Sequence, residues 1–83
     1  MKLRYFAWVR EKTGVSEEEI DLPANVATVS DVIAWLKTRG PEFEHAFKNS
    51  EAVRAAIDMS HVEQTHSVSD AHEIAFFPPV TGG

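Results

Sequence analysis

Cysteine is absent from this sequence of 83 residues, and lysine and arginine together number only eight. Without cysteine there is no disulfide scaffold and no thiol nucleophile, which fits a reducing compartment. The few basic residues are scattered and the net charge is -5, which argues against nucleic acid as a partner. An acidic surface suits either a basic protein partner or simple solubility.

Long apolar runs and leader-like segments are missing as well. Arg4 and Arg10 interrupt the opening MKLRYFAWVRE, so it does not match a secretory signal, and no run approaches membrane-spanning length. We therefore expect a cytoplasmic protein that uses no membrane. A chain of this length with 43% hydrophobic residues is enough for one domain with a modest core.

Hydrophobic periodicity predicts an α+β fold: a mixed sheet with one main helix packed on one face and a short second helix. Thr28 is the expected N-cap of the main helix, and Gly40 its left-handed end, with Pro41 preventing continuation. Alternation in the first strand puts Leu3 and Tyr5 on the inner face. The expected elements are strands at 2–9, 16–22, 52–59, 62–68 and 72–77, a turn at 12–14, the main helix at 28–39 and the short helix at 42–49.

Catalytic constellations are nearly absent. There is no Gly-rich phosphate loop and no HExxH, and the histidines lack the spacing of metal ligands, so we expect them on the surface or in turns. The acidic run at 17–19 is best explained as a solvated edge strand. We expect no metal site and no enzyme activity of the chain alone.

The ending FFPPVTGG is the most informative stretch. Pro78 and Pro79 fix two φ angles and favour an extended path away from the sheet. Residues 80–83 then add about 13 Å of reach, at roughly 3.3 Å per residue. Gly82 and Gly83 lack Cβ atoms and can thread a narrow channel, and the terminal carboxylate must be activated, most plausibly by adenylation, before it can react. The alternative is a frayed end that happens to finish in glycine.

FFPPVTGG resembles the C-terminal signature of the small, sulfur-carrier subunits of molybdopterin synthase. FAWVREKTG is similar to that family's first strand and turn, and the helix start at Thr28 and the AAIDMSHV stretch follow in matching order. The resemblance implies a ubiquitin-like β-grasp domain at 1–77 and an extended tail at 78–83. Two positions depart from the family: Ala71-His72 replaces the usual Gly-Asp, and Asp58 stands where Asn is frequent.

The resemblance also implies a reaction cycle. A ubiquitin-activating-like adenylyltransferase, which consumes ATP, adenylates Gly83, and sulfur then replaces AMP to give a thiocarboxylate. The tail enters the large catalytic subunit and donates sulfur to cyclic pyranopterin monophosphate, forming the molybdopterin dithiolene within a heterotetramer. The chain itself is expected to bind no cofactor.

A docking surface is expected beside the tail. If Phe6 and Trp8 point to the open face of the sheet, they form an apolar patch with Phe77, and Arg10 adds a polar contact at its rim. The alternative is that these aromatics pack under loops. The expected partner-binding residues are Phe6, Trp8, Arg10, Phe77, Pro78, Pro79, Val80 and Thr81.

Other functions stay open at this point. A terminal Gly-Gly also suits a ubiquitin-like protein modifier, or a sulfur carrier for another pathway such as thiamine biosynthesis. A third possibility is a noncatalytic interaction module with a tail of no importance. Only the PPVT approach to the glycines favours molybdopterin synthase.

Overall fold

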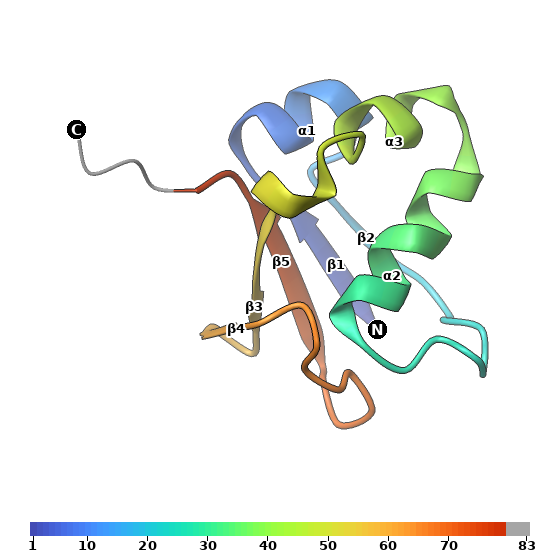
Figure 1. The fold of residues 1–83 in the computed structure, drawn as a ribbon, viewed down its shortest axis with the longest axis vertical. Coiled ribbons are helices and arrows are strands. Elements are labelled where there is room, and N and C mark those ends of the chain that lie inside the picture. The colour runs from blue at the N-terminus through green and yellow to red at the C-terminus, as the bar shows by residue number, and fades with distance from the viewer. Residues whose placement is uncertain (80–83) are drawn as a thin grey trace.

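The computed structural model describes residues 1–79, which form a five-stranded mixed sheet in the order β2-β1-β5-β3-β4, with helices gathered on one side (Figure 1). The strands β1 and β5 pair in parallel, and all other neighbours pair antiparallel. This architecture confirms the predicted α+β class. The strands are β1 (Lys2–Tyr5), β2 (Glu17–Glu19), β3 (Arg54–Ile57), β4 (Ser60–Val62) and β5 (Glu73–Phe77); the helices are α1 (Ala7–Thr13), α2 (Val29–Leu36) and α3 (Pro41–Ala46), with 3-10 turns η1 (Lys37–Arg39) and η2 (Ser50–Ala52).

The core lies between the sheet and the helices. On the sheet, alternation turns Leu3, Tyr5, Ile74 and Phe76 inward, and each is essentially buried. The Tyr5 ring stacks on that of Phe76, with centroids 6.0 Å apart, and Phe47 meets Phe76 edge-on at 5.5 Å. The helices contribute two groups of residues to the core. The predicted apolar stripe of α2 supplies Val29, Val32, Ile33 and Leu36, and the region of α3 supplies Phe43 and Phe47.

The first strand is shorter than predicted, because residues 7–13 form a helix that the sequence pattern did not suggest. Ala7 takes a positive φ of 52°, which turns the chain out of the sheet immediately after Phe6. Val9 and Thr13 then lie four residues apart, so both face the core from α1. Gly14 ends the helix with a left-handed φ of 78°, so the expected turn at 12–14 is the last turn of α1.

The start of the main helix is as predicted, and its end is not. The Thr28 side chain accepts a hydrogen bond from the Asp31 backbone N–H, and the Asp31 carboxylate accepts one from the Thr28 N–H, a complete capping box. Gly40, with φ 146° and ψ 170°, does not take the left-handed helix-end conformation. It is instead the N-cap of α3, in which Pro41 takes the first position, where a missing N–H costs nothing.

The fourth strand was predicted too late in the chain, at 62–68. Asp58 and Met59 have φ angles of 47° and 73°, and Ile57 pairs with Ser60. Two central residues of positive φ make a tight two-residue hairpin, so β4 begins directly after β3. Asp-Met is an uncommon sequence for this turn, which explains why the pattern did not indicate it. The later segment contributes only an isolated bridge between Thr28 and Ser67.

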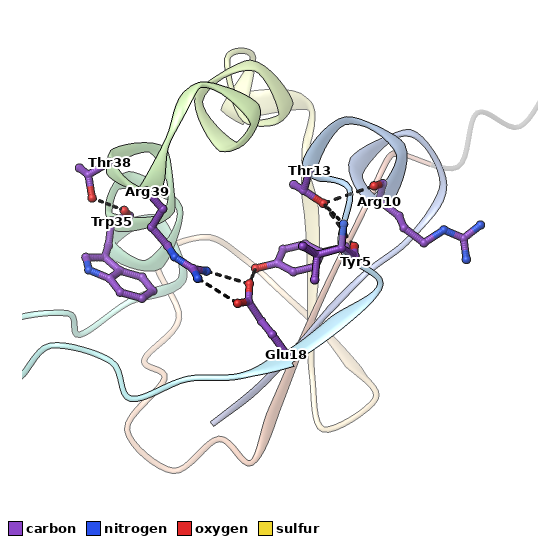
Figure 2. A network of polar contacts seen from close by, with 8 residues as sticks. Tyr5, Arg10, Thr13, Glu18, Trp35, Thr38 and Arg39 are labelled. Carbon is purple, nitrogen blue, oxygen red and sulfur yellow. Dashed lines mark hydrogen bonds and ion pairs between the residues drawn. The ribbon is translucent and has the colours of Figure 1, made fainter.

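A polar network ties the edge strand β2 to the helical layer (Figure 2). Arg39 donates two hydrogen bonds to the Glu18 carboxylate, at 2.7 and 3.0 Å, and the Tyr5 hydroxyl donates a third at 2.8 Å. The Arg39 hydrogen bonds hold the pKa of Glu18 below its usual range, although partial burial opposes this. Burial, together with the bond to Glu18, raises the pKa of Tyr5, so the phenol stays protonated as a donor.

Replacing Ala7 with glycine is expected to stabilise the protein. A left-handed conformation costs a residue with a Cβ about 1–2 kcal/mol, while glycine loses roughly 0.5–1 kcal/mol of extra chain entropy on folding. We expect Ala7→Gly to raise the free energy of unfolding by about 0.5–1 kcal/mol. Urea denaturation measures this. The matched control is Ala34→Gly on the exposed face of α2, which should lose about 1 kcal/mol; equal losses in both variants would contradict the strain at Ala7.

Glu18→Gln is expected to lower the free energy of unfolding by about 1–2 kcal/mol near neutral pH, because the bidentate bond to Arg39 loses its charge assistance. The pKa of Glu18 is lowered in the fold from its ordinary value of 4.5. The stabilisation is therefore present above that value and is lost as the pH falls through the lowered one. Denaturation of both proteins across pH checks this, with Glu63→Gln as the control, since Glu63 is exposed and forms no ion pair within the described residues. A difference that persists at low pH would disprove the charge-based account.

Candidate functional site

The tail begins at the centre of the sheet, because β5 lies between β1 and β3. The Phe6 N–H donates to the Phe76 carbonyl at 3.0 Å, which extends the parallel ladder one step beyond β1. Pro78 has no N–H, and β5 ends at Phe77. Pro78 and Pro79 are half-buried. The remaining tail residues of interest lie outside the described residues: Val80, Thr81, Gly82 and Gly83.

Two of the predicted docking aromatics share the open face of the sheet at this root. The register pairs Lys2 with Glu73 and Arg4 with Ala75, so alternation continues to Phe6 and Phe77 on the face opposite the core. Phe6 is 37% exposed, and the Arg4 guanidinium carbon lies 5.1 Å from its ring centroid. The expected placement of Phe6 and Phe77 on one face beside the tail is thus what the structure has.

Trp8 does not join them, and the predicted three-aromatic patch is wrong in this respect. The extended backbone ends at Phe6, because Ala7 takes a positive φ, so the two-residue period stops there and α1 carries Trp8 to the helical layer. There the Trp8 ring is half-buried, with the Lys12 ammonium 5.0 Å from its centroid. Arg10 is also on α1, where its exposed side chain points away from the polar network (Figure 2).

Two residues that sequence reasoning did not assign to the site lie next to Phe77. Arg54 is its register partner on β3, and the His61 ring on β4 lies 5.1 Å from the Phe77 ring. Both also line a hollow of about 460 Å³ along β3 and β4. Only the pairing of strands brings these residues together, so no local pattern in the sequence could have indicated them. We call Phe6, Phe77, Arg54 and His61 the root surface.

The opposite end of β5 has a structural and not a chemical role. The Asp58 carboxylate accepts hydrogen bonds from the backbone N–H groups of His72, at 3.1 Å, and Glu73, at 3.0 Å. Partial burial raises the pKa of Asp58, but these backbone bonds outweigh it and hold the pKa below its usual range. An ionised Asp58 thus joins the β3–β4 turn to His72 and Glu73 at the start of β5.

The described residues hold little reactive chemistry of their own. Within 1–79, no group of three histidine, aspartate or glutamate side chains is arranged to hold a metal ion, and all four histidines are exposed as predicted. In the same range, no helix is long and apolar enough to cross a membrane. What the arrangement offers is a partly apolar, partly cationic surface around the point where the chain leaves the sheet.

Comparison with known proteins gives matches over the whole chain. The model of the ThiS family matches residues 3–83. The molybdopterin synthase sulfur carrier subunit of Escherichia coli K12 is 32% identical over 83 residues, covering all of this chain and 99% of its own. A putative molybdopterin converting factor, subunit 1, from Pyrococcus furiosus superposes with a TM-score of 0.72 at 33% identity over 95% of each chain. SAMP1 from Haloferax volcanii superposes with a TM-score of 0.73 at 23% identity, over 99% of this chain and 97% of its own, which shows likeness of fold alone.

Truncating Phe6 should cost little stability, because its side chain lies on the open face. We expect Phe6→Ala to lower the free energy of unfolding by about 1 kcal/mol or less, mainly through the lost contact with Arg4. The control Phe76→Ala, at a buried position of the neighbouring strand, should cost about 3–5 kcal/mol. Thermal or urea unfolding measures both. A large loss for Phe6→Ala would mean that this ring supports the fold and is not available to a partner.

Proposed function

The chain belongs to the ThiS family, and we propose that it works as the sulfur carrier subunit of a molybdopterin synthase. The observation that carries this proposal is the ending FFPPVTGG, reached from the central strand of a β-grasp fold. The full-length likeness to a curated protein of that name supports it. Such a chain is no enzyme by itself, because its reactive group is its own terminus.

The chemistry proceeds at the Gly83 carboxylate in two steps. The carboxylate attacks the α-phosphorus of ATP and pyrophosphate leaves, which gives an acyl adenylate. Sulfide then attacks the glycyl carbonyl and AMP leaves, which gives the thiocarboxylate directly. Gly82 and Gly83 have no side chains to hinder this attack. Two such thiocarboxylates, each giving one sulfur to cyclic pyranopterin monophosphate and returning to the Gly83 carboxylate by hydrolysis, build the dithiolene of molybdopterin.

Two protein partners follow from this cycle. The first is an adenylyltransferase of the ubiquitin-activating type, which binds and consumes the ATP, and the second is the large catalytic subunit that receives the tail in a heterotetramer. We propose that the root surface contacts these partners, since Phe6 is an exposed aromatic beside the tail. Pro78, Pro79, Val80 and Thr81 would contact the channel that the tail enters. The cytoplasm is the proposed location.

A ubiquitin-like modifier is the alternative that the same terminus allows. Both functions begin with an adenylate at Gly83, and they differ in the acceptor: sulfur for a carrier, and the amine of a lysine for a modifier. The fold does not distinguish them, since the small archaeal modifier protein 1 of Haloferax volcanii and the molybdopterin converting factor superpose on this chain almost equally well. The identity of the product at the terminus decides between them.

Intact-mass measurement tests the carrier function directly. After incubation with ATP, a sulfide donor and the activating enzyme, the mass of the full chain should rise by the difference between a sulfur and an oxygen atom. Deleting Gly83 should abolish the change, because the remaining terminus falls short of the active site by one residue. The product should then convert the pyranopterin precursor when mixed with the large subunit.

The control is Met59→Leu. Met59 lies in the exposed β3–β4 turn, at the end of the sheet opposite to the one where the tail begins. This variant should load sulfur as the wild type does. An unchanged mass with an enzyme that loads a known carrier would refute the carrier function. Slower-migrating conjugates with lysines, formed in place of the thiocarboxylate, would favour the modifier.

A further inference from the structure

A second surface lies between α1 and α3, on the helical layer. These two helices lie side by side at the end of the molecule from which the tail departs (Figure 1). The reason is topological. β1 and β5 run parallel, so both strands finish at the same end of the sheet. The helix α1 follows β1 and the tail follows β5, so both begin at that end. A groove of about 340 Å³ runs between the helices, lined by Trp8, Lys12, His45, Ala46, Lys48 and Asn49.

The charge of this groove is opposite to that of the molecule. Its lining carries two lysines and a histidine but no carboxylate, in a chain of net charge -5. Lys2, Arg4 and Arg39 each form an ion pair with a glutamate. Within residues 1–79, neither Lys12 nor Lys48 has such a pair. The groove is therefore a local cationic site.

The groove also has an aromatic wall. Trp8 is half-buried, so one part of the indole packs on the domain and another part faces the groove. The Lys12 ammonium lies 5.0 Å from the ring centroid, an arrangement that holds the cation beside the aromatic surface. Tryptophan is enriched in the binding hot spots of protein interfaces and lysine is not, so Trp8 is the expected anchor and the lysines supply charge complementarity.

We propose that this groove, here called the α1–α3 groove, docks an acidic segment of the protein partner that takes up the tail. Partner carboxylates would lie between Lys12 and Lys48, and an apolar side chain would pack on Trp8. Complementary charge selects a protein segment: a nucleic acid would meet the repulsion of an acidic molecule with only two lysines here. The identity of the partner rests on the proposed function, whereas the site itself rests on the groove.

Through this second contact the partner would bind the domain independently of the tail. The root surface lies on the open face of the sheet and the α1–α3 groove on the helical layer, and both are at the edge where the chain leaves β5. A partner reaching both would hold the domain from two sides around the tail. Electrostatic attraction at the groove would act mainly on the rate of association.

The two tryptophans make the groove observable. Trp8 lines it, and Trp35 lies on α2 beside Arg39, outside it. With 5-fluorotryptophan in the full chain, adding the purified large subunit should shift the ¹⁹F signal of Trp8, whereas the signal of Trp35 should keep its position and only broaden as the complex tumbles more slowly. A Trp8 signal unmoved by the large subunit, when binding is seen by another method, would overturn the proposal.

Two charge-reversal variants form a matched pair for testing the charge of the groove. Lys48→Glu and Lys37→Glu change the net charge equally, and Lys37 is not among the groove residues. We expect Lys48→Glu to slow association with a partner about tenfold at low ionic strength, with the difference fading in high salt, and Lys37→Glu to have little effect. Equal rates for the two variants would refute the acidic occupant.

The sulfur-loading assay separates this inference from the proposed function. If the wild type loads sulfur and Lys48→Glu binds the large subunit as Lys37→Glu does, the carrier function stands and the groove proposal fails. If the groove variant alone binds weakly while no thiocarboxylate forms at Gly83, the groove proposal stands and the carrier function fails. The unfolding curve of Lys48→Glu should match the wild type, because Lys48 is exposed and makes no ion pair within the described residues. Lys37 is half-buried at the C-cap of α2, so Lys37→Glu is expected to lose some stability and is compared under conditions in which it is fully folded.

Discussion

The parallel pairing of β1 with β5 in the centre of the sheet is the constraint on which the rest of the structure depends. Parallel neighbours end at the same edge, so the segment after each strand emerges at one end of the molecule. One of these segments is α1 and the other is the tail. Both proposed surfaces, the root surface and the α1–α3 groove, follow from this single arrangement, although they lie on different layers.

The edges and turns of the sheet are held by a few specific polar contacts. Glu18 links β2 to Tyr5 and Arg39, so an acidic residue of a short edge strand is joined both to the core and to the helical layer. Asp58 joins the β3–β4 turn to the start of β5, because its carboxylate accepts backbone hydrogen bonds from His72 and Glu73. Ala7 accepts an unfavourable φ because the β1–β5 ladder and the helix α1 lie on either side of it.

The domain brings almost no chemistry to the reaction, and this suits a carrier. A reactive terminus needs a body that presents it, that partners can recognise, and that does not react itself. The central strand presents the tail, and the exposed side chains around its root offer both an aromatic face and cations. An acidic molecule that carries a cationic groove can also be oriented by the electrostatic field of its partner before the two proteins touch.

The sequence alone predicted the α+β class, the main helix with its Thr28 cap, and the inward faces of the first and last strands. It also indicated that the C-terminal residues are important. These are local properties: a periodicity, a cap or a proline acts within a few residues. The helix at 7–13, the separation of Trp8 from Phe6, and the contact of His61 with Phe77 were decided by tertiary structure. Residues 7–9 continue the alternation of the first strand, so the sequence predicted a strand there. The structure instead has a positive φ at Ala7 and packs Val9 of α1 in a core built from distant segments.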